Sequence, residues 1–159
     1  MTEFTFMVLS PQSAAWGDFD CGDPRITRKL VQEADRAAGG LQVLYGIQAG
    51  REVVAVMTLR AGELQAPLEA LASLGRGAAV PTLHLEVLAV RQAWQEQGLG
   101  RLLLESAALL ARDLAGQIGL KTLSLEATPE SRAFYQRLGF TGAESAWPDG
   151  TWPMWLILG

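Results

Sequence analysis

The stretch "QEQGLGRLLLES", residues 95–106, places Gln95, Gly98 and Gly100 between an apolar segment that ends at Val90 and a long apolar run. The first backbone N–H groups of a helix have no partner within that helix, and they carry a partial positive charge. Glycine lets a ligand come close to the main chain. The arrangement therefore predicts a loop whose backbone N–H groups bind an anion at the start of a helix.

Two common anion-binding loops do not fit this spacing. The dinucleotide-binding pattern G-x-G-x-x-G needs a third glycine where Leu103 stands, and the Walker A pattern needs a lysine where Arg101 follows Gly100. What remains is the pattern Q-x-x-G-x-G, which comes directly after the strand-like segment "LEVLAV".

This pattern resembles the acetyl-CoA pyrophosphate loop of the GNAT superfamily of N-acetyltransferases. A long amphipathic helix follows it, and "FYQRLGF", residues 134–140, is similar to the family's later F-Y-x-x-x-G-F segment. The resemblance covers nearly the whole chain. It implies the GNAT fold, acetyl-CoA as the co-substrate, and transfer of the acetyl group to an amine by direct attack.

The resemblance also implies which residues bind acetyl-CoA. Backbone groups near the end of the strand would pair with the pantetheine, and one N–H near Leu88 would stabilise the oxyanion. The family's frequent asparagine at the start of the later helix is replaced here by Thr128. The expected cofactor-binding residues are Leu88, Ala89, Val90, Gln95, Glu96, Gln97, Gly98, Leu99, Gly100, Arg101 and Thr128.

Three side chains are candidates for proton transfer. Tyr135 matches the family's usual general acid, although a tyrosine beside other apolar residues can also be a core aromatic. His84, the only histidine, and Glu86 are candidate bases. Strand alternation places them on one face, roughly 6.6 Å apart, where one water could bridge them. A histidine satisfied by its strand neighbours is the alternative.

Composition limits the class of protein. The chain has 159 residues, a net charge of −4, and a single cysteine, Cys21, which we expect to be a small buried residue. No basic leader opens the sequence, no apolar run is long enough for a membrane span, and one cysteine cannot form a zinc cluster. We expect a cytoplasmic protein with no metal, no membrane association, and little general affinity for nucleic acid.

Periodicity and turn residues predict one α/β (α+β) domain, residues 1–159, with a mixed sheet and flanking helices. The GNAT resemblance adds a splay between the fourth and fifth strands. Asp23 should cap a helix that begins at Pro24 and whose apolar stripe is made of Ile26, Leu30, Val31 and Ala34, and the last helix should begin with Thr128 as its cap. The expected strands are 3–10, 41–48, 52–60, 81–90, 120–127 and 152–159, with one short strand before the turn at 147–152; the expected helices are 24–38, 100–115 and 129–138, with a short helix 67–75 inside a loop 62–79.

The sequence leaves open which molecule accepts the acetyl group. A primary amine of a small metabolite or of a protein is the leading one. The segment "FDCG" (Phe19–Gly22), the long loop before Pro81, and "LAV" (Leu88–Val90) resemble the GNAT toxins of bacterial toxin–antitoxin pairs. That resemblance implies an aminoacyl-tRNA as acceptor and a ribbon-helix-helix antitoxin as partner, although Val87 replaces the group's usual arginine. A non-catalytic acyl-CoA-binding module is a third reading, and a homodimer through the Trp-rich C-terminal strands is expected by analogy.

Overall fold

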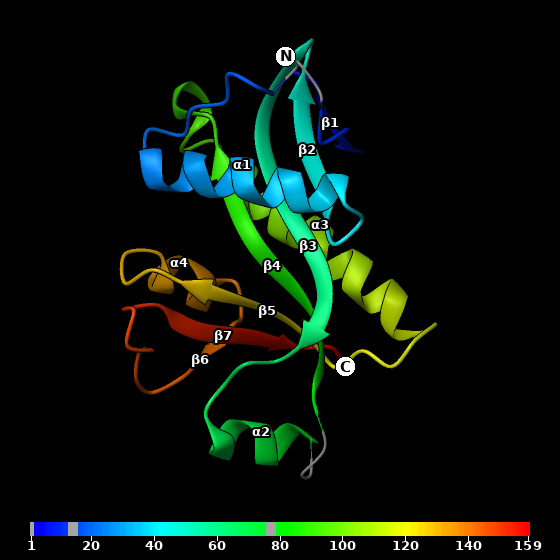
Figure 1. Cartoon of the computed structure of the whole chain (residues 1–159), viewed down its shortest axis with the longest axis vertical. Helices are drawn as coiled ribbons and strands as arrows, with labels where there is room; N and C mark the ends of the chain where they lie inside the picture. Colours follow the sequence, from blue (N-terminus) through cyan, green and yellow to red (C-terminus); the bar gives the residue numbers. More distant parts are fainter. Residues whose placement is uncertain (1, 13–15, 76–78) are drawn as a thin grey trace. The chain divides into compact units, whose positions relative to one another are not determined.

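Strands and helices follow one another in the computed structural model as the sequence predicts, with small changes at their ends (Figure 1). The structure describes residues 2–12, 16–75 and 79–159, so residues 76–78 of the expected loop lie outside the described part. The elements are β1 (Phe4–Val8), α1 (Pro24–Ala38), β2 (Val43–Ala49), β3 (Glu52–Glu63), α2 (Leu68–Gly75), β4 (Pro81–Val90), the short 3₁₀ helix η1 (Gln92–Trp94), α3 (Leu99–Ala115), β5 (Thr122–Ala127), α4 (Arg132–Arg137), β6 (Thr141–Gly142) and β7 (Trp152–Ile157).

The strands are hydrogen-bonded in the order β1-β2-β3-β4-β5-β7-β6, which confirms the mixed sheet with flanking helices. Only β4 and β5 form a parallel pair, among the pairs that the described residues give, and their register runs from Thr82–Thr122 to Leu85–Leu125. Both strands continue beyond the last pair of this register, and the expected splay between them stays a prediction.

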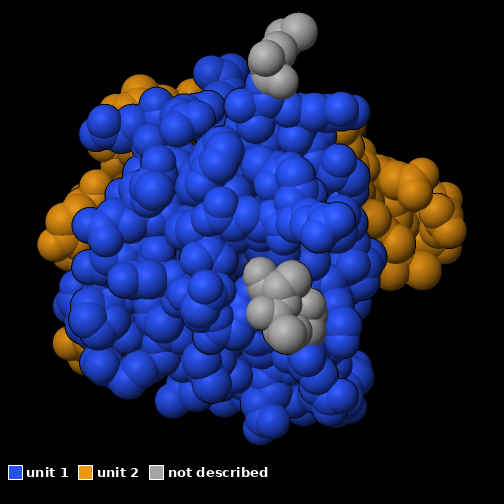
Figure 2. Space-filling model, turned by 90° about the horizontal axis from the view of Figure 1, so that it is seen from above, with its two compact units in different colours: residues 1–60, 86–106 blue, residues 61–85, 107–159 orange. Residues whose placement is uncertain are grey.

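Two compact units divide the chain, and each is described by itself. Unit 1 holds residues 1–60 and 86–106, and unit 2 holds residues 61–85 and 107–159 (coloured separately in Figure 2). The expectation of one domain over residues 1–159 stays a prediction. No helix in the described ranges is long and apolar enough to cross a membrane.

In unit 1, α1 lies across β2 and β3 (Figure 1) and buries Leu30 and Ala34 against them. The side chain of Asp23, the residue before α1, accepts a hydrogen bond from the Arg25 N–H, which confirms Asp23 as the expected cap of this helix. The prediction for Val31 is wrong, since this side chain is 60% exposed. Glu33 takes the buried place instead, because the side chains of Arg36 and Gln42 donate hydrogen bonds to its carboxylate.

In unit 2, β5 pairs with β4 on one side and with β7 on the other. Trp155 of β7 is buried in a cluster with Leu64, Val80 and residues of α2. The strand β3 reaches Glu63, so the predicted loop from residue 62 begins later than expected.

The predicted start of the last helix is wrong. The helix α4 begins at Arg132 with Ser131 before it, because Thr128 and Ser131 first close a turn of their own: the Ser131 N–H donates to the Thr128 carbonyl at 3.1 Å and the Thr128 N–H donates to Ser131 Oγ at 3.0 Å.

Gly46 in β2 has no room for a side chain. A Cβ built there would lie 2.9 Å from Leu9 Cγ, and closer to Cδ1, and 3.2 Å from the Ala55 carbonyl oxygen. Leu9 is itself buried in the unit 1 core. Gly46→Ala should therefore lower the free energy of unfolding by about 1–3 kcal/mol, measured by urea denaturation. Gly17→Ala, where nothing lies within 4 Å, is the control and should change it by less than about 0.5 kcal/mol. Equal stability of the two variants would contradict the packing.

Candidate active site

The loop between β4 and α3 has an unusual backbone. After η1, Glu96 adopts φ of 65° and Gly98 adopts φ of 81°, and α3 begins at the next residue, Leu99. No atom lies within 4 Å of a Cβ built on Gly98, so the main chain is open on that side. Since the first N–H groups of a helix have no acceptor within it, this turn presents backbone donors to a ligand.

Residues 20–22, far away in sequence, hold this loop in place. The Gln95 side-chain amide donates to the Cys21 carbonyl at 2.6 Å and to the Val90 carbonyl at 3.0 Å. The Gln92 N–H donates to the Asp20 carbonyl at 2.9 Å. The glutamine of the Q-x-x-G-x-G pattern therefore shapes the loop with its side chain, and its own N–H faces the Gln92 carbonyl at 3.4 Å.

Arg91, which sequence reasoning missed, fixes the same turn from the other side. Its Nε lies 3.0 Å from the Val53 carbonyl and 3.1 Å from Glu52 Oε1, and its guanidinium stacks over the Phe19 ring at 5.1 Å. Only its place directly after a buried strand could have pointed to this role. A cation enclosed in this way cannot turn outward to a phosphate without losing these contacts.

The exposure of β4 confirms the predicted alternation. Leu83, Leu85, Val87 and Ala89 are buried, whereas His84, Glu86, Leu88 and Val90 are half-buried.

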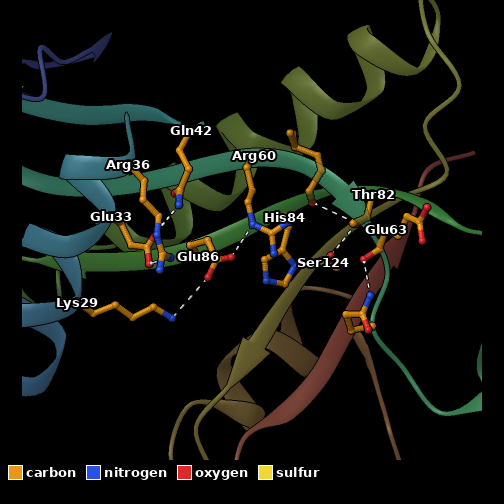
Figure 3. Close-up of polar contacts among 12 residues, drawn as sticks. Lys29, Glu33, Arg36, Gln42, Arg60, Glu63, Thr82, His84, Glu86 and Ser124 are labelled. Atoms are coloured by element: carbon orange, nitrogen blue, oxygen red, sulfur yellow. Dashed lines mark hydrogen bonds and ion pairs between the residues drawn. The ribbon is translucent and has the colours of Figure 1, made fainter. Parts of the chain in front are cut away.

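In unit 1, the Glu86 carboxylate lies between two cations, Arg60 Nε at 2.6 Å and Lys29 Nζ at 3.7 Å (Figure 3). Two cations stabilise the charged carboxylate, so the contacts favour a structural role for Glu86 over proton transfer. Its role as base stays a prediction.

In unit 2, His84 begins a chain of side-chain hydrogen bonds (Figure 3). Its Nδ1 lies 2.8 Å from Ser124 Oγ, and Ser124 Oγ lies 2.6 Å from Thr82 Oγ1. Both hydroxyl residues are 1% exposed. Sequence reasoning missed Ser124 and Thr82, because the pairing of β4 with β5 brings them together from positions about 40 residues apart.

Tyr135 is buried in unit 2, with the rings of Phe134 and Phe140 edge-on to it at 5.2 and 5.9 Å. Burial raises the pKa of the Tyr135 phenol from 10.0 to about 12. The core-aromatic reading and the acid reading are therefore compatible, because the same apolar surroundings keep the hydroxyl protonated.

The remaining predicted residues lie as follows. Thr128 in unit 2 is exposed, and its hydroxyl is hydrogen-bonded to Ser131. Arg101 in unit 1 pairs with Glu105 one turn later on α3, at 2.8 Å. Cys21 is buried in the unit 1 core, with its thiol near the Asp23 carbonyl and the Thr27 hydroxyl, as expected for a packing residue.

The described residues hold no group of three or more His, Cys, Asp or Glu side chains arranged to bind a metal ion. The chemistry that these two sets of residues can support is anion binding on the backbone of unit 1 and proton transfer by the side chains of unit 2.

Comparisons with known proteins agree with this chemistry. The family model for the acetyltransferase (GNAT) domain matches residues 45–142. No curated protein sequence matches the chain. The chain is similar to a solved structure of a bacterial toxin, with a TM-score of 0.85 and 21% identity over 99% of this chain and 92% of that one.

Two further solved structures are similar over the whole chain. A tyrosine-to-phenylalanine mutant of the AtaT toxin, bound to the C-terminus of the antitoxin AtaR and to acetyl-CoA, has a TM-score of 0.78 and 19% identity over 98% of this chain and 94% of that one. AtaT complexed with acetyl-methionyl-tRNAfMet has a TM-score of 0.79 and 19% identity over 98% of this chain and 95% of that one.

Proposed function

Because the chain belongs to the GNAT acetyltransferase family and uses acetyl-CoA, we propose that it transfers the acetyl group directly to a primary amine. The observation that carries this proposal is the geometry of the loop before α3, which presents helix N-terminal N–H groups beside an open Gly98. These donors suit the diphosphate of coenzyme A. Acetyl-CoA supplies an activated acetyl group as a thioester.

The chain's own residues would move the protons. The amine nitrogen attacks the thioester carbonyl, the C–S bond breaks, the sulfur gains a proton and the nitrogen loses one. Tyr135 would donate the first proton, because its phenol stays protonated. Its raised pKa makes it a weaker acid than free tyrosine, so the proton passes only as the sulfur leaves. His84 would accept the second proton, since an imidazole titrates near neutral pH.

No residue is needed for covalent catalysis in this scheme. Cys21 is the chain's only cysteine, and it is buried among apolar side chains of unit 1. A single buried cysteine also agrees with a cytoplasmic location, which we propose on that ground.

Gly98→Ala tests the loop. A side chain at φ of 81° costs ~1–2 kcal/mol, so the loop must strain or change shape, and we expect acetyl-CoA to bind about tenfold more weakly by calorimetry. Gly150→Ala is the matched control: Gly150 has φ of 87° and the same open surroundings, but lies in the turn before β7. Unchanged affinity in Gly98→Ala, or an equal loss in both variants, would exclude the loop as the diphosphate site.

Tyr135→Phe tests the acid. We expect kcat to fall by about 10²-fold with little change in acetyl-CoA affinity, because only the hydroxyl is removed. Since the raised pKa keeps the phenol protonated as the pH rises through 10, wild-type turnover should show no fall from tyrosine ionisation between about pH 7 and pH 10. Tyr45→Phe, a half-buried tyrosine stacked on Phe6 in unit 1, is the control. Full activity of Tyr135→Phe would remove the tyrosine from the mechanism.

A second candidate acceptor is the α-amino group of an aminoacyl-tRNA. The specific support is the likeness over the whole chain to AtaT, whose solved complex contains acetyl-methionyl-tRNAfMet. The anchoring of the loop by residues 20–22 gives the toxin-like segment "FDCG" a physical purpose in this chain. Under this candidate an antitoxin would be the partner, and a homodimer stays a further prediction.

The acceptor is found by measuring thiol release from acetyl-CoA across a panel of amines. The panel contains polyamines, amino acids, lysine-containing peptides, protein N-terminal peptides, and methionyl-tRNA with uncharged tRNA as its control. Turnover with a small amine supports the first acceptor class, and turnover with charged but not uncharged tRNA supports the second. Binding of acetyl-CoA without thiol release for any member would contradict both.

A further inference from the structure

We infer that Thr82 and Ser124 hold His84 in the tautomer that carries its proton on Nδ1, and so make Nε2 the basic nitrogen. This inference rests on the proposed role of His84 as the general base. All three residues belong to unit 2, and their side chains lie in one row across β4 and β5 (Figure 3).

The row follows from the strand register. His84 lies opposite Ser124 in the parallel pair, and Thr82 lies two residues before His84, on the same face of β4. The distance from Thr82 Oγ1 to Ser124 Oγ is 2.6 Å and that from His84 Nδ1 to Ser124 Oγ is 2.8 Å, both typical of good hydrogen bonds. Thr82 and Ser124 are each 1% exposed, so water has little access to replace either contact.

The donor-to-acceptor direction of these hydrogen bonds is set at the buried Thr82 end of the row. Thr82 Oγ1 lies 3.2 Å from the Thr122 carbonyl oxygen and 3.3 Å from the Leu83 carbonyl oxygen. Carbonyl oxygens only accept, and a hydroxyl has one hydrogen to give. If that hydrogen pointed to Ser124, the lone pairs of Thr82 would face two carbonyl oxygens in a buried site, which is unfavourable.

The Thr82 hydroxyl therefore donates to a backbone carbonyl and accepts from the Ser124 hydroxyl. Ser124, having given its hydrogen, can only accept from the imidazole, so Nδ1 of His84 is the donor. A neutral imidazole carries one proton, so its Nε2 has the lone pair. Thr82 and Ser124 are thus positioning residues, which act on the reaction through His84.

The proton balance of the step is simple. One N–H bond of the attacking amine breaks and one N–H bond forms at Nε2, while the Nδ1–H bond to Ser124 remains. The positive charge gained by the ring is stabilised by a row of oxygens that ends on backbone carbonyls. The opposite tautomer, with its proton already on Nε2, could not take this proton.

Nitrogen-15 NMR tests the inference directly, because His84 is the only histidine of the chain. Two-bond correlations from the ring carbons' protons to the two nitrogens identify the tautomer, at a pH where the titration of the ring shows it to be neutral. We expect Nδ1–H in the full-length protein. A spectrum with the proton on Nε2 would overturn the inference, whatever the activity.

Thr82→Val should reverse the direction of the hydrogen bond between Ser124 and His84 while leaving His84 itself unchanged. It removes the acceptor of the Ser124 hydrogen at nearly constant volume, so Ser124 should turn and donate to Nδ1, and the ring should shift to the Nε2–H tautomer. With His84 as base, kcat should then fall by about 10²-fold with an unchanged KM for acetyl-CoA. Thr82→Ser keeps the hydroxyl and should retain both the Nδ1–H tautomer and the turnover.

The outcomes separate this inference from the proposed function. A tautomer that stays Nδ1–H in Thr82→Val overturns the inference. A tautomer that switches while kcat stays the same supports the inference and removes His84 as the base. Circular dichroism checks that each variant is folded, and if Thr82→Val does not fold, the tautomer of the wild-type and Thr82→Ser proteins decides the question.

Discussion

The two-residue period of β4 is the constraint on which the proposed chemistry depends. Its odd-numbered residues from Leu83 to Ala89 are buried, so a slip of one residue would bring His84 and Glu86 into the cores and their apolar neighbours out. The cost of that exchange fixes the register, and the register fixes which groups His84 and Glu86 meet. The Nδ1 atom of His84 is hydrogen-bonded to the Ser124 hydroxyl of β5, whereas the Glu86 carboxylate contacts two cations. One strand thus gives two of its polar side chains, His84 and Glu86, different environments.

The loop that follows β4 is shaped by side-chain contacts as much as by its glycines. Gln95 and Gln92 connect it to residues 20–22, and Arg91 connects it to β3 and Phe19. A glycine-rich loop alone would sample many conformations, and each would have to be lost when an anion binds. Contacts already made in the folded chain would reduce that loss for the proposed diphosphate site.

Much of the fold and the position of the loop before α3 were predictable from local sequence signals. Alternation predicted the burial of β4 from Leu83 to Val90, Asp23 and Pro24 marked the start of α1, and the pattern Gln95-x-x-Gly98-x-Gly100 located the turn into α3. The failures have non-local causes. The burial of Glu33 depends on Gln42, beyond the helix, and the roles of Ser124 and Thr82 depend on a strand register that no local pattern encodes. At Thr128, a helix-capping residue followed by proline was interpreted as the start of a helix, but Thr128 first closes a turn with Ser131 and α4 begins only at Arg132.

Charge and fold point to the acceptor in different ways. A net charge of −4 gives no general attraction for a polyanion such as tRNA. On α1, Arg25 lies 3.1 Å from Asp23 and Lys29 pairs with Glu86, so part of the local positive charge is balanced as well. The likeness to AtaT concerns the backbone, which surface charges hardly affect, since exposed side chains can change sign without altering the fold. This likeness therefore concerns the fold alone, and the acceptor is selected by side chains that the likeness leaves free to differ. The net charge of −4 agrees with the proposed cationic amine as acceptor.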